Sequence, residues 1–279
     1  MPGNSNFGTS AFCVMRWEAK AWDSRTDSLL NSGCSFGLGS CEDNWANESV
    51  VPVSVSQEIP WRFITFGSDS AYAAIDACES QGWSLVTNRQ WMTIARDIEG
   101  QNENWVDGII GSSRSSGGGM ILGLSSGSPS NSDGLNEGSG TDRRTFKLST
   151  GDVIWDVSGN MWEYVDLTET GDAFTSYVCD NAGQWNEFRD CNFVAPFSAN
   201  DSVDKRFELG PSNADYDTSN HVGQVHTRDE SYDDTILRRG GSLYDSSSYT
   251  GIYTSTRVEI DHQAANVGFR CVASPIHYS

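Results

Sequence analysis

Few residues in this chain of 279 residues have the types and spacing needed for acid–base or nucleophilic chemistry. The sequence holds four histidines, and two of them, His221 and His226, stand five positions apart. This spacing matches neither the H-E-x-x-H motif nor a facial metal triad. Residues 33–37 (Gly-Cys-Ser-Phe-Gly) match the G-x-S-x-G motif of hydrolases, which requires a strand before it and a helix after it. Here the motif lies in a loop rich in Gly and Ser, so neither pattern indicates a catalytic site.

A glycine turn flanked by carboxylates is the second candidate, in residues 156–164 (Asp-Val-Ser-Gly-Asn-Met-Trp-Glu-Tyr). Asp156 and Glu163 could converge on a hard cation, with backbone carbonyls completing its oxygen shell. The alternative is a turn that leads into a strand, with Trp162 in the core and Glu163 on the surface. Spacing alone favours the turn.

Seven cysteines are spread along the chain without a C-x-x-C motif, which excludes zinc ribbons and thioredoxin-like redox motifs. Cys34 and Cys41, and likewise Cys179 and Cys191, are close enough in sequence to close two loops in an oxidising compartment. An odd number leaves at least one thiol free or paired outside the chain. The alternative is a set of buried, unreactive thiols in a reducing cytosol.

The chain is strongly acidic, with 18 Lys and Arg against 38 Asp and Glu and a formal net charge of −20. This charge argues against nucleic-acid binding and against docking on anionic lipid. The longest apolar stretch, around residues 120–122, is far too short to span a membrane, so we expect no membrane insertion. The acidic, loop-rich composition favours an extracellular or cell-surface location, on a prokaryotic cell or a virus particle, with any leader or anchor removed.

Two helices are predicted from caps and spacing. Ser68 or Asp69 can cap a first helix, which Gly82 ends. Thr87 and Gln90 form a capping box for a second helix, which ends before Gly100. The apolar positions of this second helix follow helical spacing and belong to the core: Trp91, Ile94, Ala95 and Ile98.

The remaining sequence predicts short strands and long loops. Strands are expected at residues 12–17, 235–239 and 267–272, and irregular insertions at about 23–60, 111–141 and 168–235. Few helices, many short strands and long loops indicate one α+β domain over residues 1–279.

Four segments, in order along the chain, resemble signatures of the formylglycine-generating enzyme (sulfatase-modifying factor) family. Residues 82–91 resemble its "G-x-x-x-LPTEAEW" helix start, residues 156–164 its "GNVWEW", residues 239–242 its "RGGS" and residues 266–271 its "N-x-GFRC" terminus. The resemblance spans about residues 10–273. It implies a C-type-lectin-like fold, with two helices, small antiparallel sheets, long irregular loops, and both termini near one small sheet.

The same resemblance implies a disulfide and a metal site. In relatives the helix Cys and the "GFRC" Cys are bonded, which maps to Cys78 and Cys271. With Cys34–Cys41 and Cys179–Cys191, this leaves Cys13 as the odd thiol. In relatives the "GNVWEW" turn binds calcium, so we expect a structural Ca²⁺ site here. Its ligands would be Asp156, Gly159, Met161 and Glu163.

The catalytic residues of the family do not carry over. Its enzymes have two copper-binding cysteines shortly after "RGGS", where this chain has Asp245 and Thr250. Neither residue is a soft ligand for Cu(I). The iron-dependent sulfoxide synthases of the same fold need a His-rich site, which four scattered histidines do not supply. We therefore expect no catalytic residues and no enzyme activity.

Between Gly241 and Asn266 the sequence is rich in Tyr, Ser, Asp and Thr, the composition of an antibody-like binding surface. In this respect the chain resembles the variable proteins of diversity-generating retroelements. In these, a lectin-fold segment between "RGG" and "GFR" is mutagenised at adenines. We expect a receptor- or adhesin-like display protein whose segment 242–265 varies and binds a protein or another macromolecule. The expected ligand-binding residues are Tyr244, Asp245, Ser247, Tyr249, Tyr253, Ser255, Arg257, Asp261 and His262.

Three alternatives remain open from the sequence. The segment could be an ordinary polar loop of a degenerate family member. The chain could be a sulfatase-modifying-factor enzyme with rearranged chemistry. It could also be a lectin that holds a sugar through Ca²⁺.

Overall fold

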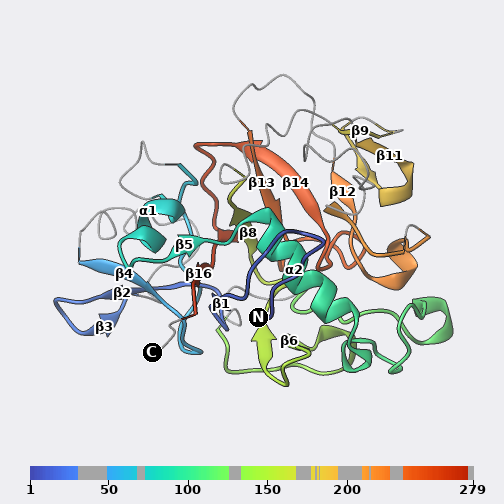
Figure 1. Cartoon of the computed structure of the whole chain (residues 1–279), viewed down its shortest axis with the longest axis horizontal. Helices are drawn as coiled ribbons and strands as arrows, with labels where there is room; N and C mark the ends of the chain where they lie inside the picture. Colours follow the sequence, from blue (N-terminus) through green and yellow to red (C-terminus); the bar gives the residue numbers. More distant parts are fainter. Residues whose placement is uncertain are drawn as a thin grey trace.

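The computed structural model describes residues 1–30, 49–67, 73–125, 133–167, 177–179, 181, 183–193, 209–213, 215–226 and 235–275. These ranges contain two α-helices, short 3-10 helices and five small sheets, which confirms the predicted α+β class. The arrangement is consistent with a C-type-lectin-like fold (Figure 1). No helix in the described ranges combines the length and the apolar character that a bilayer span requires.

The largest sheet in the described ranges is a mixed sheet of six strands. Its strand order is β10-β12-β14-β13-β8-β15. The central strand β13 is antiparallel to both β14 and β8, whereas β12–β14 and β8–β15 are parallel pairs. The strands are β8 (Trp162–Val165), β10 (Trp185–Asn186), β12 (Val225–His226), β13 (Thr235–Arg239), β14 (Ser255–Glu259) and β15 (Val267–Gly268).

Four smaller sheets surround it. In the sheet β1-β16-β5 a strand near the start of the chain pairs with a strand near its end, as the family resemblance implied. In Figure 1 the β2, β3 and β4 strands and the β9–β11 pair appear at opposite sides of the view. The bounds are β1 (Cys13–Val14), β2 (Lys20–Asp23), β3 (Ser28–Leu29), β4 (Val50–Val53), β5 (Ser84–Leu85), β6 (Thr145–Lys147), β7 (Val153–Trp155), β9 (Tyr177–Cys179), β11 (Cys191–Phe193) and β16 (Cys271–Ala273).

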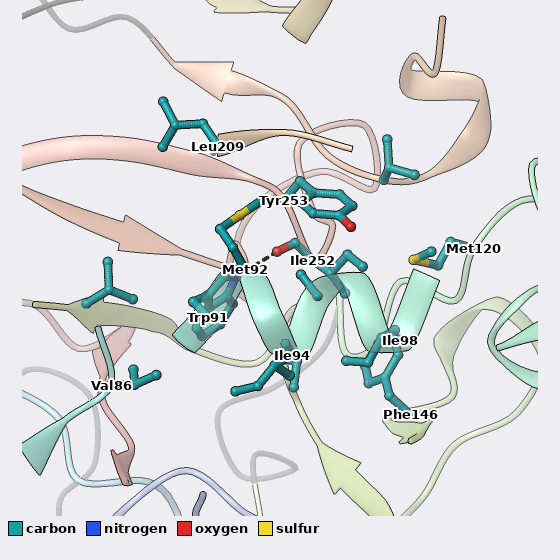
Figure 2. Close-up of a cluster of buried hydrophobic side chains, with 14 of the residues drawn as sticks. Val86, Trp91, Met92, Ile94, Ile98, Met120, Phe146, Leu209, Ile252 and Tyr253 are labelled. Atoms are coloured by element: carbon teal, nitrogen blue, oxygen red, sulfur yellow. Dashed lines mark hydrogen bonds between the residues drawn. The ribbon is translucent and has the colours of Figure 1, made fainter. Parts of the chain in front are cut away.

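Helix α2 (Asn88–Glu99) forms as its caps predict. The Thr87 hydroxyl accepts a hydrogen bond from the Gln90 amide, and the Gln90 side chain accepts one from the Thr87 amide. The apolar face of the helix is buried, and the Trp91 indole donates to the Ile252 carbonyl at 2.9 Å (Figure 2). This contact ties α2 to the chain just before β14.

Helix α1 (Ala74–Glu79) is shorter than predicted. Ala73 is its N-cap residue, and residues 68–72, with the predicted caps Ser68 and Asp69, lie outside the described residues. The helix ends at Glu79, and a turn follows to Gly82, which has a φ of +69°. The strand predicted at residues 267–272 is also interrupted. It forms two strands, β15 and β16, which are separated by Phe269 and Arg270.

The predicted irregular insertions contain regular structure and core residues. Strands β3 and β4 fall in 23–60, and β9 to β12 fall in 168–235. Residues 120–122 (Met-Ile-Leu) are buried, so the Gly- and Ser-rich region 111–141 crosses the core in part. The described 3-10 helices are η2 (Asn102–Asn104), η3 (Arg114–Ser116), η5 (Gly140–Asp142), η7 (Phe188–Asp190) and η8 (Thr218–Asn220).

Candidate ligand-binding face

Two glycines with left-handed backbone open the segment 242–265. Gly240 and Gly241 have φ values of +90° and +77°, a region that favours glycine. The Gly240 amide donates to the Thr254 carbonyl, and the Gly251 amide donates to the Gly240 carbonyl. Residues 242–250 therefore form a loop whose two ends are held together by the backbone.

Arg239, directly before this loop, anchors it to the interior. Its guanidinium is fully buried and donates to the carbonyls of Leu209 at 2.8 Å and Tyr253 at 3.1 Å, and to the Asn88 side chain. The loop start, the start of α2 and the approach to β14 are thus joined through one side chain.

The loop exposes its polar and aromatic side chains. Tyr244 is 45% exposed, Ser246 and Ser248 are exposed, and Ser247 and Tyr249 are half-buried. The half-buried Asp245 also holds the turn, since its carboxylate accepts from the amide and the hydroxyl of Ser242, each at 2.7 Å.

Tyr253 and Ser255, two of the predicted ligand-binding residues, are not on the surface. Both are 0% exposed, because the chain enters the core after Thr250 to form β14. The Tyr253 hydroxyl donates to the buried Glu99 carboxylate, and the Arg96 guanidinium lies 5.2 Å from the ring centroid. Burial, and then the nearby Glu99 charge, raise the pKa of Tyr253 well above its usual value. Both are therefore core residues, and the Tyr253 carbonyl, which accepts from Arg239, helps to hold the loop.

The other predicted residues lie on β14 or beyond its far end. Arg257 is half-buried, Asp261 is exposed and His262 is half-buried. The Tyr164 hydroxyl donates to the His262 carbonyl, and the Arg238 guanidinium lies 3.5 Å from the His262 ring nitrogen Nε2. Arg257 lies within β14 (Ser255–Glu259), and the whole of that strand lies between the 242–250 loop and Asp261 and His262.

Two residues outside the predicted segment belong to the same face. The half-buried Trp185 of β10 stacks on Tyr249, with ring centroids 4.8 Å apart and planes 12° apart. His226 of β12 meets the Trp185 ring edge-on at 4.9 Å. Sequence reasoning missed Trp185 because only the fold brings it to Tyr249. The available signal was a Trp within a polar loop bounded by two cysteines.

The predicted calcium turn has other partners. Both Asp156 carboxylate oxygens accept from the Arg144 guanidinium at 2.7 Å. Glu163, expected at the surface by the turn interpretation, is 0% exposed and forms a bidentate pair with Arg270. The Arg270 guanidinium also donates to three backbone carbonyls, those of Met15, Trp155 and Asp156.

Gly159 and Met161, the other two predicted calcium ligands, have structural contacts in the turn. A Cβ on Gly159 would lie 2.6 Å from the Leu124 carbonyl oxygen, so only glycine fits there. The Met161 amide donates to the buried Glu18 carboxylate at 3.1 Å. In the described ranges, no three His, Cys, Asp or Glu side chains gather as a metal site would need. Guanidinium groups thus pair with both carboxylates of the predicted calcium site, and that site stays a prediction.

The cysteines pair as predicted where the structure describes them. Cys78 is bonded to Cys271, and Cys179 to Cys191. Cys13 is free and exposed. Cys34 and Cys41 lie outside the described residues. The two disulfides fit an oxidising compartment.

The fold and the site together define an α+β protein that presents a Tyr- and Ser-rich loop between the neighbouring strands β13 and β14 of a mixed sheet. No family model and no curated protein matches the chain. The chain is similar in structure to the Major Tropism Determinant M1 Variant, with 14% sequence identity and a TM-score of 0.35. The likeness covers 92% of this chain and 48% of that one, so this chain spans about half its length. A likeness at this level establishes neither a family nor a function.

Proposed function

We propose that the chain is a non-catalytic, ligand-binding display protein whose segment 242–265 is diversified by a retroelement. One observation carries this proposal: residues 244–249 of the loop have exposed or half-buried side chains, while buried groups hold the backbone of the loop. The Thr254 hydroxyl donates to the Tyr249 carbonyl, and the Tyr249 amide donates to the Ser246 carbonyl. A loop held in this way can change its exposed side chains and keep its path.

The composition of the face supports a protein partner. Tyr supplies a large contact area with few rotatable bonds, and Ser adapts its hydrogen bonds. After the burial of Tyr253 and Ser255 is taken into account, the proposed contact residues are Tyr244, Asp245, Ser247, Tyr249, Arg257, Asp261 and His262. Two disulfides support a location outside the cell, on a cell surface or a virus particle.

The two positions at which the family's enzymes have copper-binding cysteines support a non-catalytic role. Asp245 is engaged with Ser242, and Thr250 is 0% exposed with its hydroxyl donating to the Ser246 carbonyl. Both residues therefore serve the architecture of the loop.

A display library tests the proposal. Six positions of the face are randomised, and clones are selected against immobilised lysozyme: Tyr244, Ser246, Ser247, Ser248, Tyr249 and Asp261. A control library randomises six exposed positions elsewhere: Ser24, Arg25, Thr26, Ser28, Asn102 and Glu103. We expect folded binders from the first library and none from the control. Equal yields from both libraries, or no binder from the face library, would contradict the proposal.

A further inference from the structure

The Tyr249 ring ends a row of stacked side chains that begins outside the segment 242–265. Trp185 stacks on Tyr249 and also on the buried Trp162, whose ring centroid is 6.2 Å away with planes 15° apart. The Arg238 guanidinium lies 4.6 Å from the Trp162 ring centroid. The row therefore connects the 242–250 loop with Arg238 and, next to it, His262.

The register of the six-stranded sheet explains this row. Trp185 pairs with His226, His226 with Thr256, and Thr256 with Arg238. Side chains of directly paired residues point to the same face of a sheet. Trp185 is thus placed on the sheet face that also carries His226 and Arg238.

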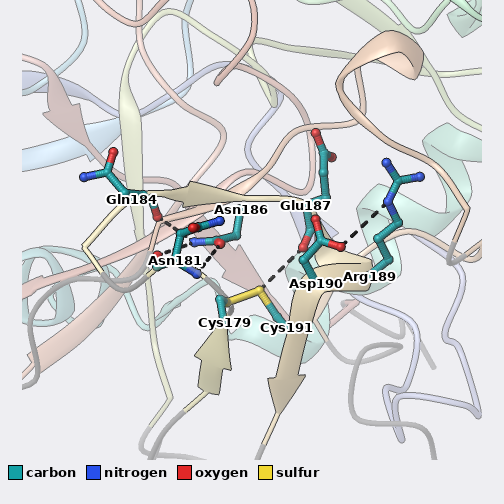
Figure 3. The surroundings of a disulfide bond; sticks show 8 residues. All are labelled: Cys179, Asn181, Gln184, Asn186, Glu187, Arg189, Asp190 and Cys191. Carbon is teal, nitrogen blue, oxygen red and sulfur yellow. Dashed lines mark hydrogen bonds and ion pairs between the residues drawn. A yellow bond between two sulfur atoms is a disulfide. The ribbon is translucent and has the colours of Figure 1, made fainter.

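The loop that carries Trp185 is held at several points. The Cys179–Cys191 disulfide closes it, and the strands β9 and β11 pair next to that bond (Figure 3). The Asn186 side chain donates to the carbonyls of Asn181 at 2.9 Å and Gln184 at 2.8 Å, and accepts from the Asn181 amide.

The residue after Asn186 fixes the same loop to its neighbours. The Glu187 carboxylate accepts from the Gln224 side chain at 2.9 Å and from the Thr218 amide at 3.3 Å. Phe188 packs edge-on against the buried Tyr253, with ring centroids 6.5 Å apart. The residues before and after Trp185 in the chain are therefore both anchored, and they hold the backbone that carries the indole.

A ring held in this way is oriented before a ligand arrives. Fixing a side chain at an interface costs conformational entropy, and a ring already stacked in the free protein avoids part of that cost on binding. Within the described part of the chain, no residue forms a hydrogen bond with the Tyr249 hydroxyl. This hydroxyl is therefore available to a ligand.

We propose that Trp185 is a positioning residue of the binding face: its ring is held in place and orients, by stacking, the aromatic side chain at position 249. The group received there is planar and hydrogen-bonding, such as an aromatic or guanidinium side chain of a partner protein, since such groups stack on an oriented ring. The inference rests on the proposed ligand-binding function. It adds that one part of the specificity comes from a residue outside the diversified segment.

The experiment repeats the lysozyme selection in three scaffolds: the natural one, Trp185→Ala and the control Trp83→Ala. Trp83 is a matched control because it is also half-buried and packs against the same core cluster as Trp185. We expect aromatic residues to be enriched at position 249 among binders from the natural and Trp83→Ala scaffolds, and not from Trp185→Ala. Transfer of Trp185→Ala into a selected clone should weaken lysozyme binding at least tenfold, and Trp185→Phe should restore most of it.

Each result has one meaning. The same enrichment at position 249 in all three scaffolds would overturn the role of Trp185 and leave the proposed function standing. No binder from any scaffold would overturn the proposed function itself. If Trp185→Ala fails to fold, Trp185→Leu takes its place, because leucine fills much of the volume without an aromatic face.

Discussion

Tyr244, Tyr249 and Tyr253 lie within one short segment, and each has different surroundings. Tyr244 is 45% exposed, Tyr249 is half-buried on Trp185, and Tyr253 is 0% exposed with its hydroxyl on Glu99. The sequence composition does not distinguish the three residues, but their burial does. It indicates that Tyr244 can contact a ligand, that Tyr249 can do so from a fixed orientation, and that Tyr253 supports the loop. The three should therefore differ in what their substitution changes.

At Tyr253, removal of the hydroxyl should lower stability. Tyr253→Phe leaves the buried Glu99 carboxylate with one donor fewer, so the free energy of unfolding should fall by about 1–3 kcal/mol. Tyr244→Phe, on the exposed loop, should change it by less than about 0.5 kcal/mol. Urea unfolding of both variants measures the difference. Equal effects at the two positions would show that Tyr253 does not have the supporting role assigned to it.

Lys20 gives stability a dependence on pH. The side chain is 2% exposed, and burial lowers its pKa from 10.5 to about 8. Between these two values the unfolded chain binds more protons than the folded chain at this residue, so stability rises with pH there. The free energy of unfolding of the natural protein should rise relative to that of Lys20→Met by about 2–3 kcal/mol from pH 7 to pH 10. A constant difference between the two proteins across that range would refute the shift.

At the scale of elements, local signals predicted some parts well and others poorly. The capping box at Thr87 and the apolar spacing of 91–98 predict α2, because both operate within one or two turns of the helix. Burial of Tyr253 and the stacking of Trp185 on Tyr249 could not be predicted. They depend on pairing between β10, β12 and β14, which are far apart in sequence.

The Glu163–Arg270 pair joins β8 to the end of the chain and is 0% exposed on both sides. Arg270→Gln leaves the Glu163 charge buried without its partner, which should lower the free energy of unfolding by about 3–5 kcal/mol. The double variant Glu163→Gln, Arg270→Gln should recover a large part of that loss, since no unpaired charge remains. Denaturant unfolding of the two variants measures this. A double variant no more stable than the single one would contradict the pairing argument.

Calcium should not stabilise the 156–163 turn, because Arg144 and Arg270 already occupy its carboxylates. We expect the melting temperature to stay the same, within about 1 °C, on chelation with EDTA and on re-addition of millimolar Ca²⁺, since only a ligand bound to the folded state shifts it. Differential scanning calorimetry makes the test. A fall on chelation that calcium reverses would restore the metal site expected from the family resemblance.

At the scale of the whole molecule, the Cys78–Cys271 disulfide joins α1 to β16 across 193 positions of sequence, while Cys179–Cys191 spans 12. In the chain-entropy model, loss of the long cross-link costs about 5 kcal/mol and loss of the short one about 3 kcal/mol. Cys78→Ala with Cys271→Ala should therefore lower the melting temperature more than Cys179→Ala with Cys191→Ala. The reverse order would show that strain or residual structure outweighs loop length.

If the exposed loop belongs to a diversified display protein, the gene that encodes it should carry the signature of that diversification. The measurement is to sequence the source locus, with several kilobases downstream, from many individual genomes. We expect a near-copy of the DNA encoding residues 242–271, differing mainly at adenines, beside a reverse-transcriptase gene. The variable codons should fall on the exposed and half-buried positions 244–249 and 261–262 and spare the buried Tyr253 and Ser255. An invariant 3′ end with no second copy would contradict the proposed diversification.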